Sequence, residues 1–67
     1  MNIELNGNPE TFTEASLTVR EVLKKKGWSF PLIIVRINGT LVDRNAWDAT
    51  RIDNGDLVEM LHLVSGG

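Results

Sequence analysis

The residues that could take part in chemistry stand close together near the end of the chain, in the stretch "LHLVSGG". His62 is the one histidine of the 67 residues. As the single histidine of the sequence, it is expected to have a structural rather than a catalytic role. Gly66 and Gly67 follow the small residue Ser65. A glycine pair at an end is normally a frayed terminus, and the alternative is a working tail that threads a narrow channel in another protein.

If the tail is functional, its reactive group is the α-carboxylate of Gly67, and Ser65 and Gly66 enter the channel. A carboxylate is a poor acyl donor until it is activated, for instance as an acyl-adenylate. The sequence holds no phosphate-cradling loop and no nucleophile–base pair that could perform this step. We therefore predict a carrier protein without catalytic residues of its own and without a bound cofactor, and we expect partner enzymes to supply the chemistry.

The composition of the chain argues against several other classes of protein. The chain has no cysteine, which excludes disulfides and thiolate metal sites, and one histidine cannot form a metal site alone. The net charge of −2 argues against nucleic acid and anionic membranes as partners. The longest apolar run, "PLIIV", is too short to span a membrane, and "MNIELNG" shows no secretory signal, so we expect the cytoplasm. The lysine run 24–26 is interpreted as a solvated helix end rather than a phosphate site.

A small fold must position these residues, because 67 residues allow one domain. We expect a folded body over residues 1–64 and a flexible tail over residues 65–67. "MNIELN" alternates apolar and polar residues, which predicts a strand, and "ETFT" predicts its hairpin partner after the turn "NGNP". "SLTVREVLKKKG" predicts the one clear helix, because Thr18 and Glu21 can form a capping box and Gly27 can end the helix.

Three further strands are predicted in "LIIVRING", "TLV" and "LVEMLHLV". Between them, "DRNAWDATRI" has no sustained period, so we expect a loop with a helical turn whose Trp47 and Ile52 enter the core. One helix of this length can cover one face of a sheet and leave the other face in solvent. The predicted fold class is therefore α+β, with a mixed sheet of four to five strands and one main helix on one face.

The uncovered face of this sheet carries a mixture of charged and aliphatic residues. Arg36 and Glu59 mark the solvent side of their strands, and Ile34, Leu61 and Leu63 share that side by alternation. Such aliphatic residues are either isolated exposed side chains, which are common, or a docking patch for a protein partner. Periodicity alone leaves both interpretations open.

Three stretches together resemble the ThiS family, the sulfur carrier proteins of thiamine biosynthesis. They are "MNIELNG", "LTVREVLKKKG" and "VRINGTLVDRNAWDATRIDNGDLVEMLHLVSGG". They cover essentially the whole chain, and their order and spacing carry the resemblance. The resemblance implies a β-grasp fold like that of ubiquitin. Ser65 is a mild departure, because the family often has an aliphatic or another small residue at this place.

The resemblance also implies a mechanism. An activating enzyme of the ubiquitin E1 type adenylates Gly67 with ATP and magnesium, and a sulfur relay converts the acyl-adenylate into a thiocarboxylate. A cysteine desulfurase or a comparable donor feeds this relay. Thiazole synthase then takes the sulfur to build the thiazole ring of thiamine. Gly66 and Gly67 match the family's terminal pair, and Ile34, Leu61 and Leu63 lie where its partners would dock.

Three other functions stay open at this point. A sulfur carrier of another pathway, above all the small subunit of molybdopterin synthase, shares the fold and the Gly-Gly end. That subunit is usually longer and tends to carry proline before its tail. A ubiquitin-like protein modifier would join Gly67 to lysines. A plain β-grasp interaction domain would carry the two glycines incidentally.

Overall fold

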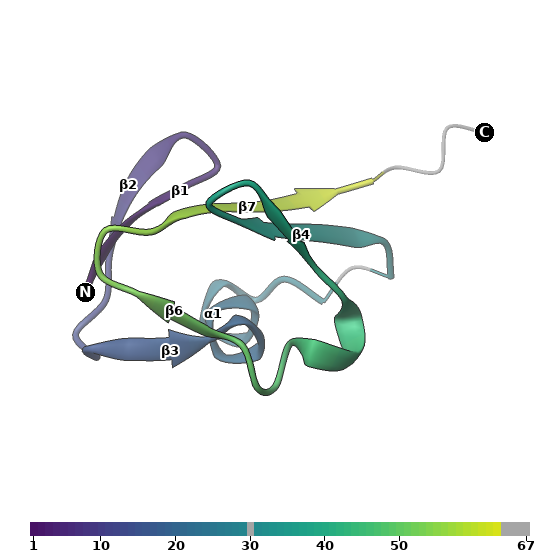
Figure 1. The fold of residues 1–67 in the computed structure, drawn as a ribbon, viewed down its shortest axis with the longest axis horizontal. Helices are drawn as coiled ribbons and strands as arrows, with labels where there is room; N and C mark the ends of the chain where they lie inside the picture. Colours follow the sequence, from purple (N-terminus) through teal and green to yellow (C-terminus); the bar gives the residue numbers. More distant parts are fainter. Residues whose placement is uncertain (30, 64–67) are drawn as a thin grey trace.

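The first and last strands of the chain lie side by side inside one sheet. The computed structural model describes residues 1–29 and 31–63, and its five-stranded sheet has the order β2-β1-β7-β4-β5 (Figure 1). β3 and β6 form a separate two-stranded sheet. The strands are β1 (Asn2–Leu5), β2 (Asn8–Thr11), β3 (Ser16–Thr18), β4 (Ile33–Ile37), β5 (Thr40–Val42), β6 (Arg51–Asp53) and β7 (Leu57–His62). The helices are α1 (Val19–Lys26) and the short 3₁₀ helix η1 (Arg44–Ala46).

β7 holds the five-stranded sheet together, because it pairs with strands from both halves of the chain. It runs parallel to β1, with Leu5 opposite Val58. It runs antiparallel to β4, with Val35 opposite Met60. The outer pairs, β1 with β2 and β4 with β5, are antiparallel, and α1 lies below the sheet in Figure 1. The mixed sheet with one main helix confirms the predicted α+β class and the ubiquitin-like β-grasp fold.

The caps of α1 explain why the helix begins and ends where the sequence predicts. The Thr18 hydroxyl accepts a hydrogen bond from the Glu21 backbone N–H at 3.2 Å, and the Glu21 carboxylate accepts one from the Thr18 backbone N–H at 2.8 Å. These two bonds form the capping box. Gly27 ends the helix with φ of 71°, a left-handed conformation that glycine adopts readily. Within residues 1–29 and 31–63, no helix is long and apolar enough to cross a membrane.

The core lies between α1 and the five-stranded sheet. Its residues occupy alternate positions on the strands and one stripe of the helix, as the sequence predicts. The buried hydrophobic residues are Ile3, Leu5, Leu17, Val19, Val22, Leu23, Val35, Trp47, Ile52, Val58 and Met60. Each fully buried aliphatic side chain stabilises the fold by roughly 1.5–3 kcal/mol. Trp47 and Ile52 enter this core although neither lies in a strongly periodic segment, which confirms their predicted burial.

The small sheet of β3 and β6 departs from the predicted elements. The sequence predicted β3 only as the approach to the helix and β6 as part of a loop. In the structure Leu17 lies opposite Ile52, and this pair is buried. Strands of three residues are too short to show alternation. β2 also spans residues 8–11 instead of the predicted 10–13, because the hairpin turn closes at Asn6 and Gly7, which both have positive φ.

Candidate protein-docking face

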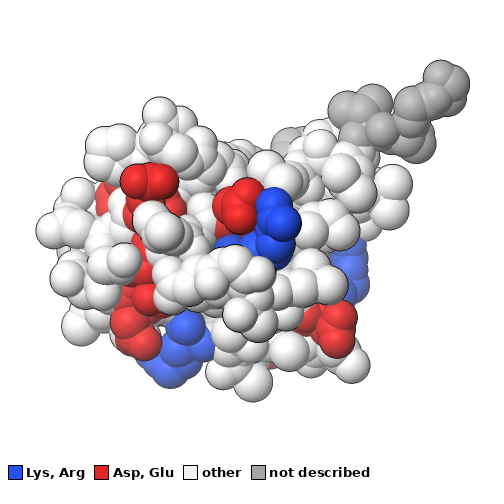
Figure 2. Space-filling model, turned by 45° about the horizontal axis from the view of Figure 1, so that its top comes forward, with Lys and Arg blue, Asp and Glu red and all other residues white. Residues whose placement is uncertain are grey.

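Alternation along β4 and β7 places aliphatic side chains on the face of the sheet that points away from α1. Ile34 lies opposite Leu61 in the pairing of these strands, and Leu63 continues the alternation just beyond β7. Ile34 is half-buried, whereas Leu61 is 38% and Leu63 is 47% exposed. Figure 2 brings the sheet side forward and shows a surface where uncharged atoms predominate and charged atoms form small separate groups. The structure thus brings together the aliphatic residues that the sequence placed on one face.

Two further leucines lie on the same face and were missed in the sequence. Leu57 is 54% exposed and lies opposite Glu4 on β1. Leu41 is 59% exposed and lies opposite Arg36 on β4. Leu57 shares the alternation of the charged residues of β7 and could have been found, whereas only the pairing of the short β5 places Leu41. We call these five aliphatic residues the open-face patch: Ile34, Leu41, Leu57, Leu61 and Leu63.

Arg36 and Glu59 lie opposite each other within the open-face patch. Nη2 of Arg36 is 2.9 Å from Oε2 of Glu59, and both side chains are about two-fifths exposed. An ion pair this exposed contributes no more than about 1 kcal/mol to stability. Nε of Arg36 is buried and has no hydrogen-bond partner among the described residues. The pair therefore offers charged groups inside an apolar surface, and arginine is a residue that protein interfaces favour.

A hollow of about 410 Å³ opens beside the open-face patch, between β1 and β7. Leu57 and Leu61 supply apolar lining, and Glu4 supplies a carboxylate, whereas the carboxylate of Glu59 is paired with Arg36. An apolar surface edged with negative charge is complementary to a segment that presents an apolar group together with a cation. The docking face is therefore concave at this point, so that a partner's side chain could insert into it.

β7 carries the chain from the open-face patch toward its end. The last residue of the strand, His62, is exposed and lies opposite Ile33, and its structural role stays a prediction. The sequence predicted a working tail of Ser65, Gly66 and Gly67, and these residues lie outside the described part of the chain. The boundary between folded body and tail also stays a prediction.

Among residues 1–29 and 31–63, no group of three or more His, Cys, Asp or Glu could hold a metal ion. Two carboxyl groups of these residues have lowered pKa values: Glu21 is in the first turn of α1, and Glu14 contacts the helix through Lys25. A hydrogen bond from Lys25 lowers the pKa of Glu14, and hydrogen bonds with Thr18, first of all from its backbone N–H, lower the pKa of Glu21. Both shifts arise from contacts that hold α1 in place.

Comparison with known proteins gives one consistent result. The model of the ThiS family matches residues 3–67 of the chain. A crystal structure of a thiamine biosynthesis protein (ThiS) from Geobacter metallireducens is 38% identical and has a TM-score of 0.88, with 100% of both chains covered. An NMR solution structure of a thiamine biosynthesis protein from the same organism is 39% identical and has a TM-score of 0.81. The match covers 100% of this chain and 88% of that chain.

Two curated proteins also match along the whole chain. A thiazole synthase of Magnetococcus marinus is 31% identical over 67 residues, and these residues make up 20% of its length. The chain therefore spans about a fifth of that protein. The uncharacterized protein ycf40 of Porphyra purpurea is 30% identical over 67 residues, which cover 93% of its length.

Proposed function

The chain belongs to the ThiS family, and from this membership we propose that it is a sulfur carrier protein of thiamine biosynthesis. One observation carries the proposal: the family match runs from residue 3 to residue 67. It therefore includes the strands of the open-face patch as well as Gly66 and Gly67. A carrier of this family is a co-substrate that presents a group to enzymes, and it is not a catalyst itself.

The proposed sulfur-carrying group is the α-carboxylate of Gly67. On an E1-like activating enzyme, a carboxylate oxygen attacks the α-phosphorus of ATP, and pyrophosphate leaves. A persulfide sulfur, supplied through a cysteine desulfurase or a comparable donor, then attacks the carbonyl carbon and displaces AMP. A thiol cleaves the resulting S–S bond, which leaves a thiocarboxylate on Gly67 and a disulfide on the enzyme. ATP and magnesium belong to the activating enzyme in this scheme, and Ser65 and Gly66 pass through its channel.

We assign the open-face patch to docking of the activating enzyme and of thiazole synthase. The support is the exposure of Leu41, Leu57, Leu61 and Leu63 beside the Arg36–Glu59 pair, because exposed apolar surface of this kind marks interaction sites. One relative that is itself named thiazole synthase contains a segment similar to the whole chain, which links this kind of domain to that enzyme. We expect the protein to work in the cytoplasm together with these partners.

Removal of Gly67 tests the proposed carrying group. The truncated and the full-length chain are each mixed with the activating enzyme, and ATP–pyrophosphate exchange is measured. We expect exchange with the full-length chain and none with the truncated one, because the carboxylate of Gly66 would fall one residue short of the reacting phosphate. Equal melting temperatures of the two proteins serve as the control for the fold. Undiminished exchange with the truncated chain contradicts the assignment of Gly67.

The intact mass of protein purified from its host separates a carrier from the alternative functions. A sulfur-for-oxygen exchange on a share of the molecules supports a carrier. Conjugates of higher mass support a protein modifier, and neither product supports a plain interaction domain. Sulfur transfer from the thiocarboxylate to thiazole synthase, but not to a molybdopterin precursor with its synthase, assigns the pathway.

A further inference from the structure

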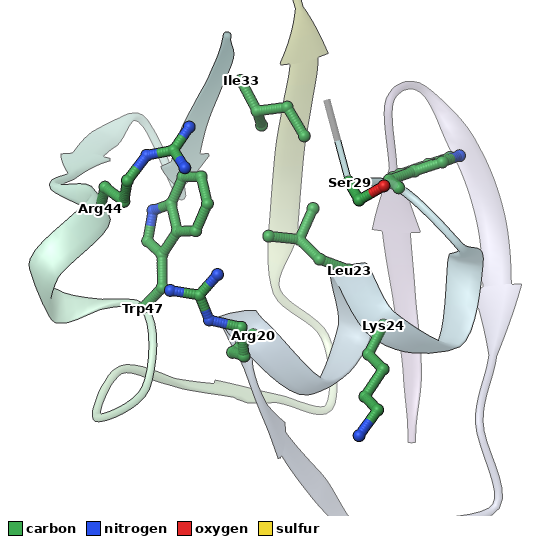
Figure 3. Close-up of a pocket in the computed structure, with 8 residues that line it drawn as sticks. Arg20, Leu23, Lys24, Ser29, Ile33, Arg44 and Trp47 are labelled. Carbon is green, nitrogen blue, oxygen red and sulfur yellow. The ribbon is translucent and has the colours of Figure 1, made fainter. Parts of the chain in front are cut away.

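A second hollow, of about 280 Å³, lies on the helix side of the molecule and is separate from the open-face patch. It opens between α1, the segment around η1 and the start of β4 (Figure 3). We call it the helix-side hollow and define it by two tryptophans, Trp28 and Trp47, and three cations, Arg20, Lys24 and Arg44. It has no part in the proposed transfer of sulfur, so its function has to be inferred from its own composition.

Two guanidinium groups are held against Trp47 at one wall of the helix-side hollow. The guanidinium carbon of Arg44 lies 4.8 Å from the centroid of the Trp47 ring, and that of Arg20 lies 5.2 Å from it. Figure 3 shows both groups next to the indole. Nη2 of Arg44 also donates to the Pro31 carbonyl at 2.6 Å, and Nε of Arg20 donates to Asp48 at 3.1 Å. Because a guanidinium has five N–H donors, each arginine keeps donors for a ligand.

The helix-side hollow is positive, although the chain as a whole is negative. Its cations are Arg20, Lys24 and Arg44, and no acidic residue is among the described residues that line it. Asp48 compensates Arg20 at the rim of the hollow, but its side chain is 74% exposed. Lys26 also lies nearby, with Nζ 5.5 Å from the centroid of Trp28, but it is paired with Glu10 at 2.7 Å and adds no net charge. The net charge of the chain is −2, so the positive charge is a local property of this surface and selects an anionic group.

The middle of the helix-side hollow is apolar. Leu23 and Ile33 lie between the wall of Trp47 and the opposite side with Ser29 (Figure 3). The left-handed turn after α1 places Trp28 at the hollow, and the backbone N–H of Trp28 donates to the backbone carbonyl of Leu23 at 2.9 Å. A free phosphate ion has no apolar group, so contact with these apolar side chains would not increase its affinity. A peptide segment with an acidic and an apolar side chain uses both features, and tryptophan and arginine are the residues that dominate the binding energy of protein interfaces.

We propose that the helix-side hollow docks an acidic segment of a partner protein. In this arrangement a carboxylate of the segment is bound by the guanidinium groups of Arg20 and Arg44, and Lys24 adds positive charge at the edge of the hollow. A neighbouring apolar side chain packs on the half-buried Ile33, next to the buried Leu23. The hollow borders α1, which covers the face of the sheet opposite to the open-face patch. A partner bound there leaves the open-face patch accessible, so the domain can hold two proteins at once. This inference stands independently of the proposed transfer of sulfur.

Intrinsic fluorescence tests the inference directly, because Trp28 and Trp47 are the two tryptophans of the chain and both line the hollow. The full chain is titrated with the capped peptide Asp-Leu-Glu-Leu-Asp, with its counterpart Asp-Gly-Glu-Gly-Asp, and with inorganic phosphate. We expect a saturable change with the leucine peptide, and a much weaker or no change with the other two. Raising the salt concentration is expected to weaken the binding.

A pair of neighbouring lysines supplies a matched control. Lys24 lines the helix-side hollow, whereas Lys25 is in the same turn of α1 and forms an ion pair with Glu14 at 2.8 Å. Lys24→Glu is expected to weaken binding of the leucine peptide about fivefold or more, and Lys25→Glu to leave it within about twofold.

Three results overturn the inference. The first is the absence of a saturable change with the leucine peptide. The second is binding of phosphate or of the glycine peptide as strong as that of the leucine peptide, which indicates a site for small anions or for charge alone. The third is equal weakening by the two lysine substitutions, which indicates long-range attraction to the helix end and no docking in the hollow.

Discussion

Gly66 stands next to the residue whose carboxylate we propose as the acyl group, so its own requirement is access. A channel that accepts a glycine backbone has no room for a branched side chain. We expect Gly66→Leu to reduce thiocarboxylate formation on Gly67 at least about tenfold, because misplacement of a reacting group by about 1 Å can cost more than that. Mass spectrometry after incubation with the activating enzyme and the sulfur donor measures the product.

The control for this prediction is a change that adds little volume at the same place, Gly66→Ala. It should retain more activity than Gly66→Leu, and both proteins should melt at the temperature of the unchanged chain. Thiocarboxylate formation at the normal rate in Gly66→Leu would falsify the idea that the tail threads a narrow channel.

At the scale of elements, the two faces of β7 have different roles: one face packs in the core and stabilises the fold, and the other is exposed and available for binding. Val58 is 1% exposed and faces the core, whereas Leu61 is on the open face. A buried, unpaired carboxylate costs a small domain about 4 kcal/mol or more, so Val58→Asp should fail to fold. Leu61→Asp should lower stability by less than about 1 kcal/mol, but should weaken binding of the activating enzyme or thiazole synthase by on the order of 2 kcal/mol if Leu61 is central to the interface. Thermal melts and titrations measure the two effects.

Leu57→Asp is the matched variant for the docking face, because Leu57 is the second exposed leucine of β7. It should fold like the unchanged chain and also bind partners less tightly. Full-strength binding by both leucine variants means that partners dock elsewhere. Loss of folding in Leu61→Asp means that this residue stabilises the domain more than its exposure indicates.

The N-terminal cap of α1 makes part of the stability dependent on pH. The pKa of Glu21 is lowered in the folded protein by its hydrogen bonds with Thr18. A carboxyl group with a lowered pKa contributes stability that is fully present above its unfolded pKa of about 4.3 and is lost as the pH falls through the folded pKa. Glu21→Gln retains a side chain that can reach the Thr18 N–H but removes this titration.

We therefore expect the melting temperature of Glu21→Gln to fall less than that of the unchanged chain between pH 6 and pH 3. Some loss should persist, because Glu14, which also has a lowered pKa through its hydrogen bond from Lys25, still titrates. Thr18→Ala breaks the same capping box and should cost about 1 kcal/mol at neutral pH. An identical acid-induced fall in the glutamine variant and the unchanged chain contradicts the assigned role of Glu21.

At the scale of the whole molecule, Asn6 ties the N-terminal hairpin to the C-terminal strand. Its side chain donates to the Met60 carbonyl at 3.1 Å and accepts from the Met60 N–H at 2.8 Å. The φ of Asn6 is 52°, which glycine also adopts without strain. Asn6→Gly should therefore retain the turn and lose both bonds, at a cost of about 1–2 kcal/mol, or roughly 4–16 °C in melting temperature for a domain of this size.

Asn8→Ala is the control for this prediction, because Asn8 makes one long side-chain contact, 3.5 Å from Nδ2 to the Asn6 carbonyl, and is exposed. Its melting temperature should change little. If Asn6→Gly is no less stable than Asn8→Ala, the bonds between Asn6 and Met60 do not hold the two ends of the chain together.

Features that depend on neighbours in the chain could be read from the sequence. The capping box joins Thr18 and Glu21, which are three positions apart, and Gly27 marks the end of α1. The alternation of β7 assigned Val58 to the core and Leu61 to the open face, because a strand turns successive side chains to opposite faces. The order of these elements, together with the glycine pair, was enough to recognise the family.

Features that depend on pairing between distant segments were decided only by the tertiary structure. The strands β3 and β6 exist because burial brings Leu17 and Ile52 together, and three residues are too few to show a period. Leu41 joined the open-face patch through the pairing of β5 with β4. The helix-side hollow forms where α1, η1 and β4 meet, so that Arg20 of α1 lies against Trp47, which is far from it in the chain, whereas Arg44 stands only three residues before Trp47. Contacts of this kind follow from three-dimensional packing, and local propensity carries no trace of them.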